Sequence, residues 1–127
     1  MLLDASAVLA YLFDEKGGSS VRERMRQPVS MSAVNLAEVI GKIRQKRGTS
    51  IELDSLLGGL SLRVLAFGPK ELQSLMDLEA MAGKTFSGLA LADRICLATA
   101  HAHNLTVVTG DRAWKALALP IEITLIC

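Results

Sequence analysis

Short apolar runs alternate along the chain with longer segments in which apolar residues recur at helical spacing. The short runs predict strands at residues 1–5, 29–32, 61–67, 105–109 and 121–126. The periodic segments predict helices at residues 6–13, 21–26, 33–46, 51–60, 69–82 and 89–102, with a short helix around Trp114. This alternation belongs to the α/β class and predicts a three-layer α/β/α sandwich with a central, mainly parallel sheet.

Polar and glycine residues mark where several of these helices begin or end. Ser20 and Glu23 have the spacing of a capping box for the second helix. Ser32 is expected to cap the third helix, which Gly48 closes, and Ser50 is expected to cap the fourth.

The fifth helix, from Pro69, is expected to pack through one apolar side, and residues 83–88 after it are expected to form a loop. The predicted packed side consists of Leu72, Leu75, Met76 and Leu78.

Length and composition predict one domain over residues 1–127, because half of the 127 residues are hydrophobic. The longest apolar segments are interrupted by acidic residues and are shorter than the ~20 residues that cross a bilayer, so no membrane span is expected. The first residues lack the features of a secretory leader, which favours a cytoplasmic location.

The cysteine and histidine residues do not form a recognisable site. Cys96 and Cys127 are expected to be unpaired, with Cys96 buried as a small hydrophobe. His101 and His103 are two residues apart, so on a helix they point in different directions and cannot easily chelate one ion.

The net charge is only +1, yet the first 47 residues hold most of the cations. If acids in that half bind a metal, its outer surface is basic and suits a phosphate backbone; otherwise the cations belong to solvated helices. The cations are Lys16, Arg22, Arg24, Arg26, Lys42, Arg44, Lys46 and Arg47.

Four acidic residues lie at or beside the ends of apolar runs: Asp4, Glu38, Asp93 and Asp111. In a parallel sheet, groups that follow strand ends gather at one edge. Asp93 interrupts the apolar side of its helix, where an isolated buried carboxylate would be costly. We therefore expect the four carboxylates to converge around a cation.

Each acid also has a local explanation. Asp4 and Asp111 can cap the helices that follow them, and Glu38 is correctly spaced for an ion pair with Lys42. The two explanations remain open for each residue taken alone.

A pocket of carboxylates without histidine or cysteine selects a hard cation such as Mg²⁺ or Mn²⁺. Such an ion can activate water and stabilise charge on a phosphoryl oxygen. The hydroxyls of Ser6 and Thr109, two residues from Asp4 and Asp111, are positioned to support these carboxylates.

Four segments in this order resemble the PIN-domain ribonucleases, particularly VapC-type toxins of toxin–antitoxin pairs. These segments are LLDASAVLAYL, SAVNLAEVIGKI, GLALADRICLATA and VVTGDRAW. The match departs from many relatives before Asp93, where Ser87 would replace their serine, and the first strand is very short.

The resemblance implies a PIN-like fold and a Mg²⁺- or Mn²⁺-dependent endoribonuclease that cuts transfer or ribosomal RNA. Family members are typically homodimers that a cognate antitoxin inhibits. The implied catalytic and metal-binding quartet is Asp4, Glu38, Asp93 and Asp111, supported by Ser6, Thr109 and Asn35, with Arg94 and Arg112 on the substrate.

Two other functions are compatible with parts of the pattern. A catalytically silent PIN-like module would bind RNA or protein without cleavage. A phosphatase or phospho-receiver domain fits less well, because Asp4 has no adjacent acid and Arg112, where such domains place a lysine, follows Asp111.

Overall fold

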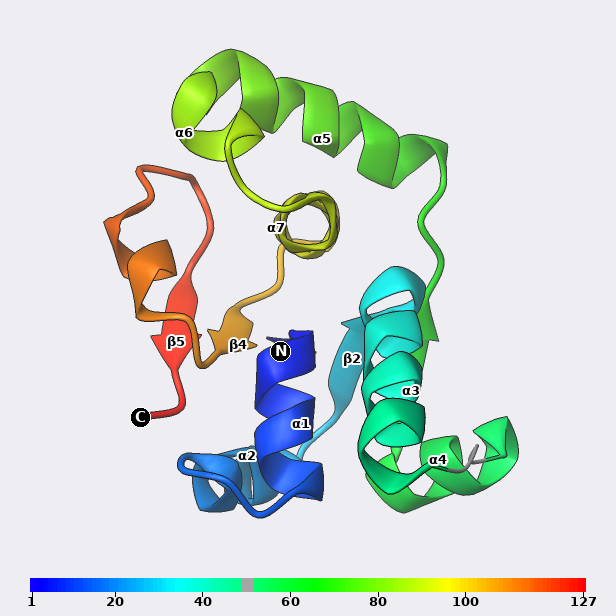
Figure 1. The fold of residues 1–127 in the computed structure, drawn as a ribbon. Helices are drawn as coiled ribbons and strands as arrows, with labels where there is room; N and C mark the ends of the chain where they lie inside the picture. Colours follow the sequence, from blue (N-terminus) through cyan, green and yellow to red (C-terminus); the bar gives the residue numbers. More distant parts are fainter. Residues whose placement is uncertain (49–51) are drawn as a thin grey trace.

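The computed structural model describes residues 1–48 and 52–127 of the chain (Figure 1). The elements follow in the order β1 (Leu2–Leu3), α1 (Ala5–Leu12), α2 (Gly18–Arg24), β2 (Val29–Ser32), α3 (Ala33–Arg47), α4 (Leu53–Leu60), β3 (Leu62–Leu65), α5 (Pro69–Ala82), α6 (Lys84–Ser87), α7 (Leu91–His103), β4 (Val107–Thr109), the 3₁₀ helix η1 (Arg112–Ala116) and β5 (Ile123–Leu125).

The strands form one parallel sheet in the order β3-β2-β1-β4-β5. The first strand, β1, lies in the centre and pairs with β2 on one side and β4 on the other. Because all neighbours are parallel, the chain leaves every strand at the same edge of the sheet and returns through the helices. The predicted α/β class and parallel sheet are confirmed.

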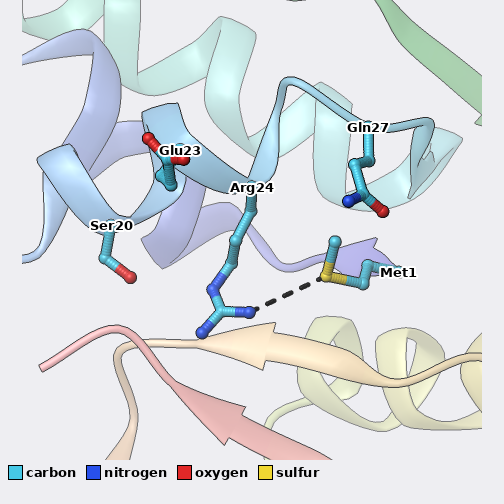
Figure 2. Close-up of a pocket in the computed structure, with 5 residues that line it drawn as sticks. All are labelled: Met1, Ser20, Glu23, Arg24 and Gln27. Carbon is cyan, nitrogen blue, oxygen red and sulfur yellow. Dashed lines mark hydrogen bonds between the residues drawn. The ribbon is translucent and has the colours of Figure 1, made fainter.

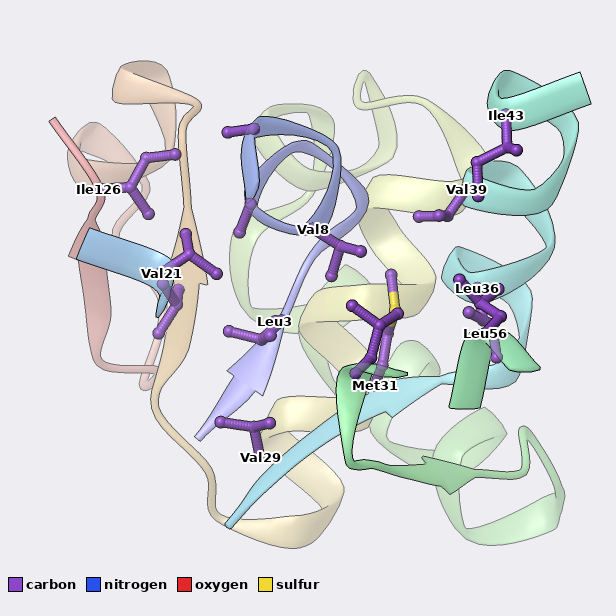
Figure 3. Packing of buried hydrophobic residues seen from close by; sticks show 14 residues of the cluster. Leu3, Val8, Val21, Val29, Met31, Leu36, Val39, Ile43, Leu56 and Ile126 are labelled. Atoms are coloured by element: carbon purple, nitrogen blue, oxygen red, sulfur yellow. The ribbon is translucent and has the colours of Figure 1, made fainter. Parts of the chain in front are cut away.

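Adjacent residues of each strand face opposite layers. Leu3 and Val108 belong to the core shared with α1, α2, α3 and α4, part of which Figure 3 shows. Leu2 and Val107 belong to the second core, which includes Phe86, Trp114 and the buried side of α7. Figure 1 shows α7 end-on between α5 and the strands, whereas α1, α2 and α4 lie below the strands in that view. The predicted α/β/α sandwich is therefore confirmed.

The second helix begins earlier than predicted. Gly17 is its N-cap with φ of 90°, so Ser20 and Glu23 lie inside α2 and the predicted capping box is wrong. A Cβ on Gly18 would lie 2.5 Å from the backbone oxygen of Ala10. Close packing of α2 on α1 therefore decides where the helix starts, which local capping signals do not report.

The packed side of α5 also differs from the prediction. Leu78 is buried in the second core and Leu75 packs against it, as predicted, but Leu72 and Met76 are 48% and 63% exposed. Glu71 and Ser74 are buried in their place. Apolar residues occur on both sides of this helix, and α5 instead packs on α7 through the side that carries Glu71 and Ser74.

Two further predictions concern short segments. The predicted loop at residues 83–88 contains the helix α6, whose Phe86 is buried in the second core. Ser50 and Ile51, the predicted cap and first residue of the fourth helix, lie outside the described residues, and α4 as described begins at Leu53. Ser32 and Gly48 cap α3 as predicted.

Cys96 is buried and Cys127 is exposed, and both are unpaired, as predicted. Within residues 1–48 and 52–127, none of the helices combines the length and apolar character that crossing a membrane requires.

Candidate functional site

The carboxyl edge of the sheet brings together segments that are distant in the sequence. Asp4 directly follows β1, and Asp111 follows β4 after a one-residue turn. Glu38 lies on α3, which begins directly after β2, and Asp93 lies in the first turn of α7. Asp4, Glu38 and Asp111 thus follow parallel strands that end at the same edge, whereas Asp93 reaches this edge on a helix that follows α6.

Asp4 is the most deeply buried of the four acids, with 5% of its surface exposed. One carboxylate oxygen accepts hydrogen bonds from the Ser6 hydroxyl at 2.7 Å and the Ala7 amide at 2.9 Å. The other accepts a hydrogen bond from the Thr109 hydroxyl on β4. Asp4 is thus both the N-cap of α1 and a buried group fixed between two strand ends. The helix-capping role and the metal-binding role that the sequence left open for Asp4 are therefore compatible.

The environment of Asp4 disfavours its negative charge. Burial raises its pKa above the usual aspartate value, and the nearby charge of Asp111 adds to this shift. The hydrogen bonds from Thr109, Ser6 and Ala7 act in the opposite direction but do not cancel the effect of burial. A cation at this edge would reverse the unfavourable term.

Asn35 connects α3 to α7 and orients Glu38. Its side-chain amide donates to Glu38 Oε1 at 3.0 Å and to the Ala92 backbone oxygen at 3.1 Å. Asn35 is 1% exposed, and its Oδ1 atom is buried with no hydrogen-bond partner among the described residues. No ion pair between Glu38 and Lys42 occurs within the described structure.

Asp93 is half-buried, and the other three acids act on it. Burial raises its pKa, and the charges of Glu38, Asp111 and Asp4 raise it further, in that order. Asp93 is therefore close enough to each of the other three acids for their charges to act on it. That the four carboxylates share one cation stays a prediction.

Cys96, one turn after Asp93, senses the same charges. Burial raises the pKa of its thiol well above the usual value, and Asp4, Asp93 and Glu38 contribute in the same direction. The thiol therefore stays protonated, which argues against a nucleophilic role.

Asp111 is exposed at the mouth of this cluster. It caps η1 by accepting a hydrogen bond from the Ala113 amide at 3.0 Å. Its own amide donates to the Thr109 hydroxyl, also at 3.0 Å, so Thr109 links Asp111 to Asp4. The amide of Gly110 donates to Ser6 at 2.9 Å, which closes the small polar network.

The cluster has the chemistry of a hard-cation site without direct three-ligand geometry. In residues 1–48 and 52–127, no group of three or more acidic, histidine or cysteine side chains is arranged to hold one ion. Carboxylates about 5 Å apart repel by roughly 3 kcal/mol at an effective dielectric of 20, which favours separation. The donor set is nevertheless entirely oxygen, and Mg²⁺ commonly binds one or two carboxylates directly and others through water. The residues present therefore fit Mg²⁺ or Mn²⁺.

Cations flank the acidic cluster. A pocket of about 550 Å³ along α3 is lined by Glu38, Lys42, Arg44 and neighbouring residues of α3. The sequence left open an ion pair between Glu38 and Lys42, whereas in the structure both residues line this pocket. The sequence does indicate that Lys42 lies beside Glu38, because residues four apart share one side of a helix.

The two predicted substrate-binding arginines differ in their surroundings. Arg94 donates to the Leu89 backbone oxygen at 3.1 Å and lies 3.5 Å from Glu79, so part of its guanidinium is already engaged. Arg112 is exposed at the start of η1, next to Asp111.

Comparison with known proteins gives a family and a set of similar folds. The family model described as "PIN domain" matches residues 1–119. Comparison with curated proteins finds no match to the sequence.

Several solved structures share the fold at low sequence identity. The toxin–antitoxin complex from Klebsiella pneumoniae has a TM-score of 0.75 and 17% identity, covering 99% of this chain and 97% of that chain. DNA-bound VapBC from Salmonella typhimurium has a TM-score of 0.75 and 20% identity, with the same coverage. FitAcB from Neisseria gonorrhoeae has a TM-score of 0.67 and 22% identity, covering 96% and 94%.

Proposed function

This chain belongs to the PIN domain family, and we propose that it is a metal-dependent endoribonuclease and the toxin of a type II toxin–antitoxin pair. The observation that carries the proposal is the position of Asp4, Glu38, Asp93 and Asp111 at the carboxyl edge of the sheet, where Asn35 bonds to Glu38 and to the residue before Asp93, and where the other three acids raise the pKa of Asp93. The repulsion among four carboxylates in a partly buried space lowers the stability of the fold. A divalent cation would turn this repulsion into attraction, which explains why the carboxylates are there.

Asp4, Asp93 and Asp111 would hold the Mg²⁺ or Mn²⁺, directly or through water, and Glu38 would complete the set or orient the attacking water. The cation supplies activation of water and stabilisation of charge on the phosphoryl oxygen. Residues that hydrogen-bond to the carboxylates hold them in orientation before RNA binds, because the orientation of a metal ligand depends on its own hydrogen-bond partners.

Three residues perform that positioning. Thr109 and Ser6 donate hydroxyl hydrogen bonds to the two oxygens of Asp4, which fixes the plane of the carboxylate. Asn35 donates to Glu38 and holds α3 against α7, so that Glu38 faces Asp93.

Exposed cations would bind the RNA backbone beside the carboxylates. Lys42 lies in the same pocket as Glu38, and Arg112 follows Asp111. Arg94 would contribute through the donors that Glu79 and Leu89 do not use. Phosphate contacts of this kind position a strand without reading its sequence.

The partners in this proposal come from the family and its solved relatives. The similar structures from Klebsiella pneumoniae and Salmonella typhimurium are a toxin–antitoxin complex and a VapBC complex bound to DNA. By analogy, this chain would pair with an antitoxin, form a homodimer, and cut transfer or ribosomal RNA in the cytoplasm. Sedimentation of the purified chain with and without a co-expressed antitoxin measures both assemblies.

A catalytically silent binding module is the second candidate. It is favoured by the lack of a direct three-ligand group among the described residues. Such a module would bind RNA or a protein partner through the same basic surroundings.

Cleavage of purified RNA distinguishes the two candidates. Total RNA is incubated with the protein in Mg²⁺, in Mn²⁺ and in chelator, and the Asp4→Asn and Asp93→Asn variants are compared with Asp54→Asn, which alters an exposed acid on α4. The nuclease proposal expects cation-dependent cleavage by the parent and by Asp54→Asn only. A gel shift without cleavage under any condition would support the silent module instead.

A further inference from the structure

A second polar pocket lies on the opposite edge of the sheet from the four acids. It has a volume of about 370 Å³ and is lined by Met1, Ser20, Glu23, Arg24 and Gln27 (Figure 2). Met1 precedes β1 and Gln27 lies before β2, so the pocket is at the amino ends of parallel strands. It is separate from the carboxyl edge.

Arg24 in this pocket lacks a suitable partner. In the part of the chain that the structure describes, its Nη1 atom donates to the Met1 thioether alone, with 3.9 Å between nitrogen and sulfur, and thioethers are weak acceptors. Its Nε atom is buried and has no hydrogen-bond partner among the described residues. Buried donors are nearly always paired, so an unpaired one on a permanent cation indicates a missing acceptor.

Nearby carboxylates do not supply that acceptor. Glu23 pairs with Arg26 at 3.2 Å, and both side chains are exposed. The ion pairs found within residues 1–48 and 52–127 do not include Arg24. The positive charge of Arg24 is therefore left to act on whatever enters the pocket.

The other polar residues add neutral donors around this cation. Figure 2 shows the Arg24 guanidinium reaching toward Met1, with Ser20 on the opposite side and Gln27 beyond Met1. A hydroxyl and a carboxamide can both donate hydrogen bonds to an oxyanion.

We propose that this pocket binds a phosphate group, either inorganic phosphate or a phosphate monoester. A guanidinium binds phosphate oxygens through two parallel hydrogen bonds, and those oxygens are stronger acceptors than the thioether they would displace. A monoester carries roughly −1.5 to −2 charges at neutral pH, which strengthens its attraction to Arg24. The like charge of Glu23 at the rim is already paired with Arg26.

Ligand-induced thermal stabilisation of the whole chain tests the proposal. Inorganic phosphate is titrated at constant ionic strength set with sodium chloride, and adenosine 5′-monophosphate is compared with adenosine. The variant Arg24→Gln removes the guanidinium, whereas the controls Arg22→Gln and Lys16→Gln remove exposed cations of α2 and of the turn before it. Arg22 lies 5.9 Å from the Tyr11 ring, and neither control residue lines the pocket.

A saturable rise in melting temperature is expected for the parent and both controls, with affinity reduced about tenfold or more in Arg24→Gln. Stabilisation by the monophosphate but not by adenosine assigns the monoester; stabilisation by inorganic phosphate alone assigns the free ion. No stabilisation of the parent by either phosphate would overturn the proposal, and so would equal affinity in Arg24→Gln.

Two milder variants keep the test decisive if Arg24→Gln does not fold. Arg24→Lys keeps the charge but loses the planar fork, and Ser20→Ala removes only a hydroxyl. Both are expected to weaken phosphate binding relative to Arg22→Gln. Unchanged affinity in both would overturn the proposal.

Discussion

The side-chain amide of Asn35 on α3 donates to the backbone oxygen of Ala92 on α7, 57 residues later, at 3.1 Å. The two helices cover opposite faces of the sheet, so this hydrogen bond joins the two layers at the carboxyl edge. The same amide also orients Glu38, and Ala92 is the residue before Asp93. One side chain thus fixes the distance between two acids of the candidate site.

Replacement of Asn35 by alanine is expected to lower RNA cleavage about 10–100-fold, as is usual when a group behind a ligand is removed. The free energy of unfolding should fall by only about 0.5–1.5 kcal/mol, because one hydrogen bond between helices is lost. Single-turnover cleavage and urea unfolding measure the two effects. The control is Gln73→Ala on the exposed side of α5; an equal loss of cleavage in it would contradict the positioning role.

The variant Thr109→Val removes a hydroxyl group that donates a hydrogen bond to Asp4. Of the hydrogen bonds to Asp4, this one lowers its pKa the most. That pKa is already raised by burial, so the acidic limb of the pH–rate profile should move further toward higher pH. Stability at neutral pH should fall by about 1–3 kcal/mol, because Asp4 and the Asp111 amide lose a buried partner.

The matched control for Thr109 is Thr99→Val. Thr99 is equally buried, but its hydroxyl donates within α7 to the Ile95 oxygen at 2.8 Å. It should lose some stability and leave the pH profile unchanged. A similar profile shift in both variants would show that Thr109 has no special effect on Asp4.

Neutralising Asp93 is expected to abolish cleavage and to stabilise the protein at neutral pH. The folded-state pKa of Asp93 is raised, so the folded protein holds a proton more readily than the unfolded chain. Stability therefore falls as pH rises from the unfolded pKa through the raised folded pKa, and Asp93→Asn removes this decrease.

Melting temperature against pH, with and without Mn²⁺, measures these effects of Asp93. The parent should gain stability from the cation, and Asp93→Asn should gain much less. Asp54→Asn should behave like the parent, since this exposed residue lies on α4. A parent curve that is insensitive to Mn²⁺ would argue against a shared cation.

Glu71 is expected to stabilise the junction of α5 with α7. It accepts hydrogen bonds from the Gly68 amide and from His103 Nε2, both at 2.8 Å. The Gly68 bond chiefly lowers its pKa, burial is the next largest effect and opposes it, and His103 lowers the pKa further. This stabilisation is present above the unfolded pKa of glutamate and is lost as pH falls through the lowered folded value.

Glu71→Ala should therefore cost about 1–3 kcal/mol at neutral pH and progressively less under acidic conditions. Urea unfolding at several pH values measures this. The control Glu52→Ala alters an N-cap glutamate whose side chain makes no capping hydrogen bond. An equal cost in the control, or a cost independent of pH, would contradict the assignment.

The sequence determined the class of fold and the identity of the acids, because both depend on local patterns. Alternating apolar runs and helical periods require a layered parallel sheet, and residues that follow parallel strands must share one edge. For that reason the sequence alone identifies Asp4 and Asp111 as candidate site residues. Cys96 could likewise be assigned to the core from its apolar neighbours.

Tertiary packing alone decided the features that depend on contacts between distant residues. Leu72 and Met76 have the periodicity of a packed face, yet α5 docks on α7 through Glu71 and Ser74, because His103 and His101 offer them partners there. The Asn35–Ala92 bond and the unpaired Arg24 donor have no local signature either. Hydrogen-bond satisfaction is a property of the assembled layers, whereas hydrophobic periodicity is a property of one segment at a time.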